Sequence, residues 1–379
     1  MQAHDQRDLY VRPYGEVRDI LLERLQGRRN PMDYAPPEEA RAILDRLETV
    51  ERERWAAEFS EAAEPHYAAG LAAEAAGDLA AARKEYLAAF GLLRVARYPA
   101  PNSPRKRTAY RRSKEVYFKL AAVSDHGVRR VEIPYVGAAA PGAIVVGCLH
   151  EPRHEGRRPV VVQWGGIDSF KEDRRPEIYL EAGYAVLAVD MPGVGDSPIP
   201  GSEHGEEQWN GIFDWIARES RLDAGRIALV GASTGGYWAT KLAHTHRERI
   251  ACAVNHGGPA HYAFQRDWIV RAAHGEYPFE LAETLACAFG RTSAADWLEY
   301  APKLSLLDQG VLDRPCAPLL CVNGVDDSVF PIEDMHLLLR HGDAKTARFF
   351  PGGHMGHDPA LFPTILTWLQ RQFSQRSGG

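Results

Sequence analysis

The pattern of hydrophobic and polar positions changes character near residue 130. Before that point, apolar residues recur every three or four positions, which is typical of amphipathic helices. The stretch Tyr67–Tyr98 contains a Gly-Asp turn between two such helices and resembles a single tetratricopeptide unit. A solenoid needs several stacked units, so we interpret it as a local helical hairpin. The pattern predicts a helical N-terminal domain over residues 1–128. Its expected helical stretches are Pro13–Gln26, Glu38–Glu58 and Ala62–Leu93.

After residue 130, short apolar runs alternate with helical segments. This alternation is typical of an α/β fold, in which helices cover both faces of a mostly parallel sheet. The short connection between the first two strands predicts an antiparallel start. The eight expected strands are Val131–Tyr135, Ala143–Leu149, Pro159–Trp164, Tyr184–Asp190, Arg226–Gly231, Ile250–Asn255, Pro318–Asn323 and Thr346–Phe350. The helices expected between or after them are Glu172–Ala182, Gly205–Ser220, Thr234–Arg247, Ile332–Arg340 and Pro359–Phe373.

The strand rhythm stops between Gly257 and Gln309, where helical segments take over. An insertion of this size after a strand is where a cap over an active site would lie. We therefore expect an α/β domain over residues 129–379, with a helical cap insertion at about residues 257–309.

The composition narrows the class of protein. Of 379 residues, 45% are hydrophobic and 25% are charged, as in ordinary globular proteins. The net charge of −6 argues against a protein whose main task is to hold nucleic acid. No stretch approaches the roughly 20 apolar residues of a membrane helix. A basic run at residues 105–114 is interpreted as a solvated helix face, with an anionic substrate or partner as the alternative.

The cysteines favour a reduced protein. There are five, and Cys148, Cys252 and Cys321 lie in apolar runs that are expected to be buried strands. Residues Met1–Tyr10 are polar and contain no hydrophobic block of a signal peptide. We therefore expect a cytoplasmic protein that acts on a small molecule, without a metal or other cofactor and without nucleic-acid or membrane partners. A homodimer is one candidate assembly.

The strongest chemical signal is a G-x-S-x-G motif centred on Ser233. It follows an apolar strand and precedes a helix, which is the context of a nucleophile elbow. In such an elbow a tight turn exposes the serine, and the helix behind it directs its positive end at the same point. We therefore expect Ser233 to be a nucleophile. The alternative is an ordinary glycine-rich turn between strand and helix.

A serine hydroxyl needs a base, and in this architecture the acid and then the histidine follow the serine along the chain. Asp326 and Asp327 both follow the strand that ends at Asn323. The common G-x-x-D-x-x-x-P spacing favours Asp327, with Asp326 as the alternative. His354 follows a Gly pair after the last strand and is the expected base, with His357 as the alternative.

The transition state also needs donors for a developing oxyanion. We expect the backbone N–H of Thr234 to be one donor and that of Gly166, on the loop after the third strand, to be the other. Asp168, Lys171 and Glu172 follow on that loop. An ion pair that staples the loop is the expected role of these charges, with direct catalysis as the alternative.

Aromatic residues of the insertion are weaker candidates. His261, Tyr262 and Trp268 are the candidate substrate contacts, because the first two follow a strand that ends on the same rim as the elbow. Packing is the competing interpretation for all three. It is the expected role of His256, His274 and Trp297.

Taken together, these motifs resemble the α/β-hydrolases. The helical N-terminal part, the G-G-x-D-S-x-K-E stretch from Gly165 to Glu172, and the final Gly-Gly-His narrow the resemblance. They are similar to the group that contains dihydroxypseudooxynicotine hydrolase, the fungal chain-shortening hydrolases of naphthopyrone pathways and the fermentation-respiration switch protein. The resemblance implies that a Ser-Asp-His triad hydrolyses a C–C bond next to a ketone, in an aryl ketone or a polyketide-like molecule.

Three other functions compete with this one. The same residues would serve a carboxylesterase or a thioesterase. A peptidase of the prolyl-oligopeptidase type is disfavoured, because those enzymes carry an N-terminal β-propeller and this chain has helices there. A non-catalytic binding protein is disfavoured because serine, acid and histidine are all present.

Overall fold

The computed structural model describes residues 10–125, 127–152 and 156–376, so the expectation for Met1–Tyr10 falls almost wholly outside the described residues. The chain divides into two compact units. The helical unit consists of Val11–Val128 together with Pro278–Leu281, and the sheet unit contains the rest of the described chain. The short segment Pro278–Leu281 thus belongs to the helical unit, although it comes from the middle of the sheet unit's sequence.

The described part of the helical unit contains five helices, whose buried faces carry large side chains such as Trp55, Phe59 and Tyr86. Polar side chains mark several helix starts. The Asp78 carboxylate accepts the N–H of Ala81, and the Ser103 hydroxyl accepts that of Lys106. The helices are α1 (Tyr14–Gln26), α2 (Pro37–Arg46), α3 (Arg52–Ala75), α4 (Leu79–Ala96) and α5 (Pro104–Ala122).

Two sequence expectations for this region need correction. The stretch Glu38–Glu58 is two helices, because Leu47 leaves α2 in an extended conformation and Glu51 caps the start of α3 with its side chain. In the basic run, Arg105, Arg107 and Arg111 are exposed as expected. Lys106 is instead buried, and burial lowers its pKa to about 8. The expected Tyr67–Tyr98 hairpin is present as α3 and α4, joined at Gly77 and Asp78.

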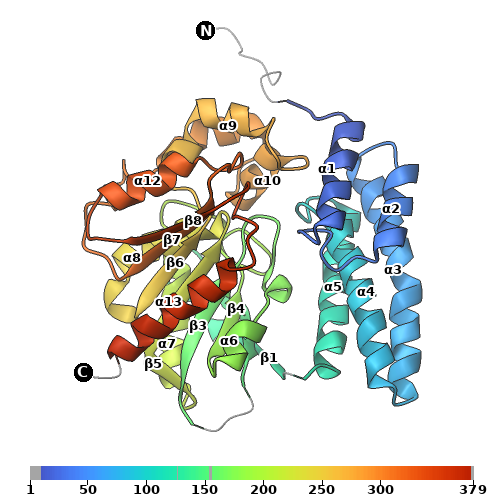
Figure 1. Ribbon diagram of the computed structural model, residues 1–379, viewed down its shortest axis with the longest axis horizontal. Coiled ribbons are helices and arrows are strands. Elements are labelled where there is room, and N and C mark those ends of the chain that lie inside the picture. Colours follow the sequence, from blue (N-terminus) through green and yellow to red (C-terminus); the bar gives the residue numbers. More distant parts are fainter. Residues whose placement is uncertain (1–9, 126, 153–155, 377–379) are drawn as a thin grey trace. The chain divides into compact units, whose positions relative to one another are not determined.

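The sheet unit contains the expected eight-stranded, mostly parallel sheet (Figure 1). Its spatial order is β1-β2-β4-β3-β5-β6-β7-β8. The strands from β3 to β8 pair in parallel, whereas β2 runs antiparallel to β4. The strands are β1 (Val128–Pro134), β2 (Ile144–His150), β3 (Arg158–Trp164), β4 (Ala185–Val189), β5 (Leu222–Ala232), β6 (Cys252–His256), β7 (Leu319–Gly324) and β8 (Thr346–Phe350).

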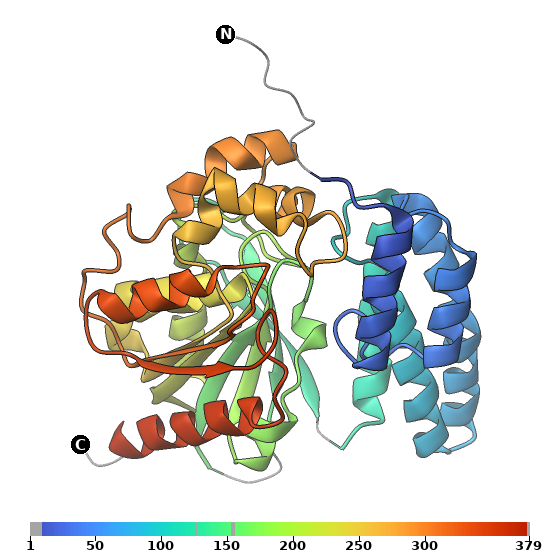
Figure 2. The same ribbon diagram turned by 45° about the horizontal axis from the view of Figure 1, so that its top comes forward.

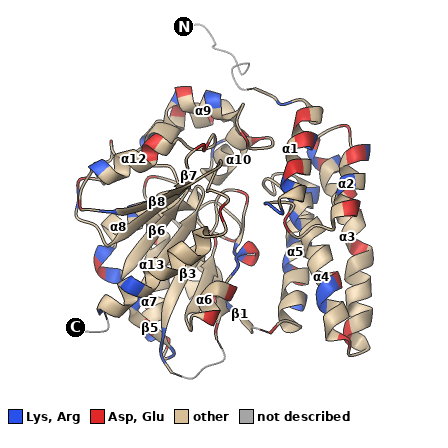
Figure 3. Ribbon diagram, viewed as in Figure 1, with Lys and Arg blue, Asp and Glu red and all other residues tan. Residues whose placement is uncertain are grey.

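Helices cover both faces of this sheet. On one face, α6 (Glu177–Glu181) and α13 (Leu361–Arg376) pack on apolar side chains of β3 to β8, and on the other lie α7 (Gln208–Arg218) and α8 (Gly235–Thr245). The strands β6 and β7 carry no charged residue (Figure 3), as expected for strands buried on both faces. The stretch expected as one helix at Glu172–Ala182 is instead a 3₁₀ turn (Lys171–Asp173) followed by the short α6.

The insertion at residues 257–309 is helical, as its sequence predicts. Figure 2 shows its yellow and orange helices gathered at one end of the sheet. It comprises the 3₁₀ turn Tyr262–Phe264, α9 (Arg266–Ala272), α10 (Leu281–Ala288), α11 (Ala294–Tyr300) and the 3₁₀ turn Ala301–Leu304. The helix α12 (Ile332–Arg340) follows β7. Among the described helices, none is both long enough and apolar enough to cross a membrane.

Cys148, Cys252 and Cys321 are buried, as expected. Each lies inside a strand of the sheet. Burial raises the pKa of the Cys252 and Cys321 thiols. These side chains therefore act as small apolar groups of the core.

Candidate active site

Ser233 lies at the turn between β5 and α8 in a strained backbone conformation. Its φ is 55°, in the left-handed backbone region that residues other than glycine rarely adopt. The Ser233 N–H donates to the His256 carbonyl at 2.8 Å, which fixes the turn. Side chains at Gly231 and Gly235 would collide with the backbone of Gly235 and Gly165 respectively. The glycines of the motif are therefore required by close packing around the serine.

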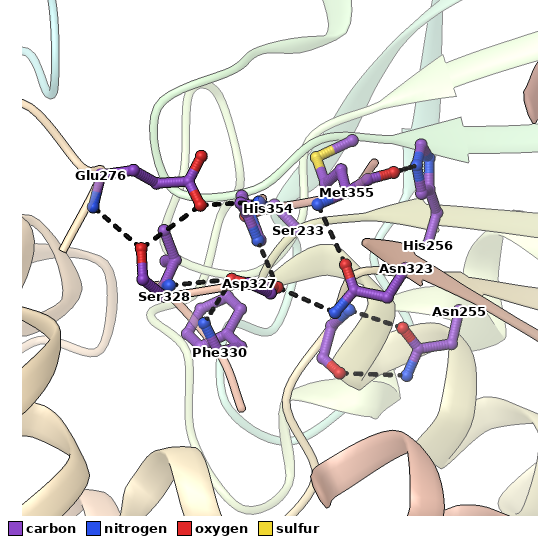
Figure 4. Close-up of polar contacts among 12 residues, drawn as sticks. Ser233, Asn255, His256, Glu276, Asn323, Asp327, Ser328, Phe330, His354 and Met355 are labelled. Atoms are coloured by element: carbon purple, nitrogen blue, oxygen red, sulfur yellow. Dashed lines mark hydrogen bonds and ion pairs between the residues drawn. The ribbon is translucent and has the colours of Figure 1, made fainter. Parts of the chain in front are cut away.

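His354 lies between Ser233 and Asp327 (Figure 4). Its Nε2 is 2.8 Å from the Ser233 Oγ, and its Nδ1 is 2.8 Å from the Asp327 Oδ2. Because a carboxylate only accepts hydrogen bonds, Nδ1 carries the proton in the neutral ring, and Nε2 is left to accept from the serine hydroxyl. This arrangement can remove the Ser233 proton.

The Asp327 carboxylate is buried and held by several donors. Its Oδ1 accepts the N–H groups of Val329 at 2.8 Å and Phe330 at 2.9 Å, and its Oδ2 accepts from the Asn323 amide at 2.8 Å. These donors fix the orientation of the carboxylate. The structure therefore places Asp327 beside His354 with its Oδ2 directed at the ring.

The alternative residues lie elsewhere. Asp326 is exposed, and its N–H donates to the Gly352 carbonyl at 3.0 Å. His357 is also exposed and lies beside Gly352. Of the two sequence candidates for each role, the structure brings Asp327 and His354 to Ser233.

Charges around His354 shift its pKa. Burial lowers the pKa of the ring, but the carboxylates of Asp327, Glu276 and Asp168 outweigh burial and raise it above its usual value. The site therefore stabilises a protonated imidazole, which a base that has taken a serine proton must become.

Gly166 lies against the nucleophile. A Cβ at this residue would lie 2.8 Å from the Ser233 Cβ, 2.9 Å from its Oγ and 3.2 Å from the Thr234 nitrogen. Thr234 is the residue at the N-terminal end of α8, which carries the positive end of the helix dipole. The structure thus brings the two expected oxyanion donors and Ser233 together.

The loop that carries Gly166 is tied down by a buried lysine. The Lys171 Nζ lies 2.9 Å from the Glu172 Oε1, 2.9 Å from the Asp190 Oδ2 and 2.6 Å from the Asp196 Oδ2. Burial raises the pKa of Glu172 to about 7, although Lys171 opposes this. These contacts support the stapling role expected for Lys171 and Glu172.

Glu276 contacts the base without having been singled out by sequence reasoning. Its Oε1 accepts the backbone N–H of His354 at 2.7 Å, and its own backbone N–H donates to the Ser328 hydroxyl at 3.0 Å (Figure 4). It lies in the insertion, where no strand fixes a register to the sheet edge. The G-E-Y stretch that contains it has no recognisable motif, so only the three-dimensional structure reveals this contact.

The three candidate substrate residues are held by other parts of the insertion and its surroundings. The His261 Nδ1 lies 2.7 Å from the Ser305 Oγ, and the Trp268 Nε1–H donates to the Val329 carbonyl at 2.9 Å. Tyr262 is 37% exposed. In the described part of the chain, no hydrogen bond joins the three side chains to Ser233 or His354. Their role in substrate binding stays a prediction.

No group of three or more histidine, cysteine or acidic side chains able to hold a metal ion occurs among residues 10–125, 127–152 and 156–376. The candidate site contains a serine with a hydrogen-bonded base and a carboxylate that orients the base, and Gly166 lies beside the serine oxygen.

Comparison with known proteins finds relatives that are named as hydrolases. The family described as FrsA-like esterases matches residues 40–369. The α/β hydrolase gkaG of Penicillium citrinum is 32% identical over 239 residues, which cover 57% of this chain and 54% of that protein. The 20-hydroxy-prefusarin hydrolase FUS2 of Gibberella moniliformis is 31% identical over 248 residues, which cover 60% of this chain and 58% of that protein. The matches span little more than half the length of these relatives.

A solved structure extends the likeness to nearly the whole chain. The 2,6-dihydroxy-pseudo-oxynicotine hydrolase superposes with a TM-score of 0.74 over 91% of this chain and 94% of that one. Its sequence identity is 20%, so this comparison shows a shared fold. It agrees with the α/β-hydrolase architecture expected from the sequence.

Proposed function

This chain belongs to the FrsA-like esterase family, and we propose that it is a hydrolase in which Ser233 is the nucleophile, His354 the general base and Asp327 the acid that orients the base. The observation that carries the proposal is the continuous pair of 2.8 Å hydrogen bonds from Asp327 through His354 to Ser233. A serine becomes reactive when such a base accepts its proton.

The reaction begins with attack by the Ser233 Oγ on a substrate carbonyl carbon. A new O–C bond forms, the carbonyl π electrons move to oxygen, and the serine proton passes to the His354 Nε2. The N–H groups of Thr234 and Gly166 stabilise the oxyanion. Asp327 stabilises the imidazolium.

The oxyanion then collapses and expels the leaving group, which takes the electron pair of the broken bond and receives the proton from His354. An acyl group remains on Ser233. Water, deprotonated by the same histidine, attacks this acyl group and releases a carboxylic acid and free Ser233.

We propose that the substrate is a small aryl ketone or a polyketide-like ketone, and that the broken bond is the C–C bond next to the carbonyl. This rests on the family resemblance and on the relative that is named as a hydrolase of 20-hydroxy-prefusarin. A carbon leaving group needs an electron sink, such as a second carbonyl that turns it into an enolate. It also needs an acid, and the raised pKa of His354 suits that role.

A carboxylic ester is the second candidate substrate. The family name itself denotes esterases, and an alkoxide or phenolate leaves more easily than a carbanion. The same three side chains serve both reactions, and a thioester would be cleaved in the same way. The leaving group alone distinguishes them.

Two substitutions test the assignment of the nucleophile and the acid. We expect Ser233→Ala to abolish turnover and labelling by a fluorophosphonate probe while the thermal unfolding midpoint stays close to that of the wild type. Labelling at another residue, or retained turnover, would remove Ser233 from the mechanism.

We expect Asp327→Asn to lower kcat by about 10⁴, because the orienting carboxylate is lost. Asp326→Asn, which changes the neighbouring exposed carboxylate, is the matched control and should keep nearly full activity. A larger loss for Asp326→Asn than for Asp327→Asn would contradict the assignment.

The substrate class is tested by a panel of p-nitrophenyl esters and aryl 1,3-diketones, with products identified by mass spectrometry. Cleavage of a diketone into an acid and a methyl ketone, dependent on Ser233, is the expected result. Turnover of esters alone would establish the second candidate.

A further inference from the structure

Met355, the residue after His354, has a strained backbone that is held on both sides. Its φ is 70°, in the left-handed region, and it is not a glycine. Its N–H donates to the Asn323 Oδ1 at 2.9 Å, and its carbonyl lies 2.8 Å from the His256 Nε2 (Figure 4). Such a conformation persists where the surroundings hold it, and here two buried side chains do so.

Asn323 joins this residue to the acid. It lies in β7, is fully buried, and uses both ends of its amide. The oxygen accepts the Met355 N–H, while the nitrogen donates to the Asp327 Oδ2 at 2.8 Å. The same Asp327 oxygen accepts from the His354 Nδ1. One rigid amide therefore sets the spacing between the acid and the loop that carries the base.

His256 joins the same residue to the nucleophile. It ends β6 and is 3% exposed, and burial lowers its pKa to about 4, so its ring is neutral. Since the Met355 carbonyl only accepts, the Nε2 of His256 carries the proton and donates it. The backbone carbonyl of His256 accepts the Ser233 N–H. The His256 side chain thus holds the base loop, which is the loop after β8 that carries His354 and Met355, and its main chain holds the turn that carries Ser233.

We propose that Asn323 and His256 are positioning residues that clamp Met355, and through it fix the His354 ring between Ser233 and Asp327. The proposal rests on the proposed function of those three residues. Three loops, after β5, β7 and β8, meet at this clamp. Misplacing a reacting group by about 1 Å can cost about 100-fold in rate, so a clamp of this kind controls turnover without touching substrate.

The geometry distinguishes this role from ordinary core packing. Asn255, on β6, is also fully buried and also bridges two segments: its amide nitrogen donates to the Thr240 Oγ1 at 2.8 Å, and its oxygen accepts the Gly258 N–H at 2.6 Å. These contacts reach neither the base loop nor the acid. Asn255 therefore provides a matched control for the loss of a buried amide.

The experiment measures kcat and KM for p-nitrophenyl acetate, the rate constant of labelling by a fluorophosphonate probe, and the thermal unfolding midpoint. Its variants are Asn323→Leu, His256→Phe, His256→Gln, the double variant of Asn323→Leu with His256→Phe, and Asn255→Leu. The labelling rate reports the reactivity of Ser233 directly, independently of the leaving group of a true substrate.

We expect Asn323→Leu and His256→Phe each to lower kcat and the labelling rate by about 100-fold, with KM changed less than about threefold. The double variant should be little worse than the worse single variant, because both side chains act through Met355. His256→Gln keeps an N–H donor and should recover most of the loss of His256→Phe. Asn255→Leu should lower the unfolding midpoint while keeping kcat within about threefold of the wild type.

The results separate failure of the clamp from failure of the proposed function. A wild type that neither turns over the ester nor reacts with the probe would overturn both. An active wild type whose folded Asn323 and His256 variants keep kcat would overturn the clamp alone. Equal losses in Asn255→Leu, additive losses in the double variant, or no recovery in His256→Gln would also overturn it. If Asn323→Leu does not fold, the His256 pair decides the question.

Discussion

At the scale of single residues, the sequence predicts the three side chains of the candidate triad but not the residues that hold them. Ser233 and His354 each lie beside glycines at a recognisable spacing, and a motif of this kind can be found in one sequence. His256 and Glu276 contact the loop that carries His354 only through folding, because their partners lie 99 and 78 positions away. Asn323 donates to Asp327 only four positions away, but no motif marks it, and its contact with Met355 spans 32 positions.

Gly166 gives a sharp test at this scale. A methyl group at this residue would lie 2.8 Å from the Ser233 Cβ and 2.9 Å from its Oγ. We expect Gly166→Ala to lower kcat by at least about 100-fold, through displacement of the serine and of an oxyanion donor. Steady-state kinetics with an ester probe measures the loss.

Gly15→Ala is the control for that substitution, because a Cβ there meets nothing within 4 Å. It lies in α1 and should leave kcat unchanged. Wild-type turnover by Gly166→Ala would show that the loop after β3 does not approach the reacting oxygen.

At the scale of elements, the strands follow from the sequence more closely than the helices do. The strands β3, β4, β6 and β7 are buried throughout and are nearly continuous apolar runs, which makes them easy to recognise, whereas β1 and β8 alternate between exposed and less exposed positions. The stretch expected as Glu38–Glu58 is two helices, since apolar spacing persists across the break at Leu47. Lys106 was expected on a solvated face but is buried, because charge patterning does not reveal which side of α5 packs.

Glu276 shows how the insertion acts on the base loop. Its carboxylate accepts the backbone N–H of His354 and contributes to the raised pKa of the histidine ring. Glu276→Gln keeps an oxygen acceptor and removes the charge. We expect the pKa of His354 to fall, so the acidic limb of the kcat/KM profile should move to lower pH.

The pH dependence of ester hydrolysis measures that shift. Ser328→Ala removes a hydroxyl that contacts Glu276 without changing a charge, and should leave the acidic limb in place. An acidic limb that moves upward in Glu276→Gln would contradict the electrostatic role of this carboxylate.

At the scale of the whole molecule, stability should depend on a carboxyl buried inside the sheet unit. Lys171 lies close to the carboxylates of Glu172, Asp190 and Asp196. Glu172 is the member whose pKa is raised to about 7 by burial. The folded protein therefore favours the protonated form of Glu172 below about pH 7.

The raised pKa of Glu172 predicts how the stability of the folded protein changes as the pH rises. A carboxyl whose pKa is higher in the folded than in the unfolded chain binds more protons when folded, so its contribution to stability is lost as the pH rises towards 7 and beyond. Glu172→Gln resembles the protonated form and should escape this loss. Between pH 5.5 and pH 8, we expect the variant to become more stable relative to the wild type by about 2 kcal/mol. Urea unfolding at both pH values measures this gain in stability.

Glu177→Gln, which removes an exposed carboxylate of the adjacent α6, is the control and should show almost no gain. The opposite result would be a wild type whose free energy of unfolding rises relative to that of Glu172→Gln as the pH rises. It would mean that Glu172 is ionised in the folded protein, and that Lys171 outweighs burial at this site.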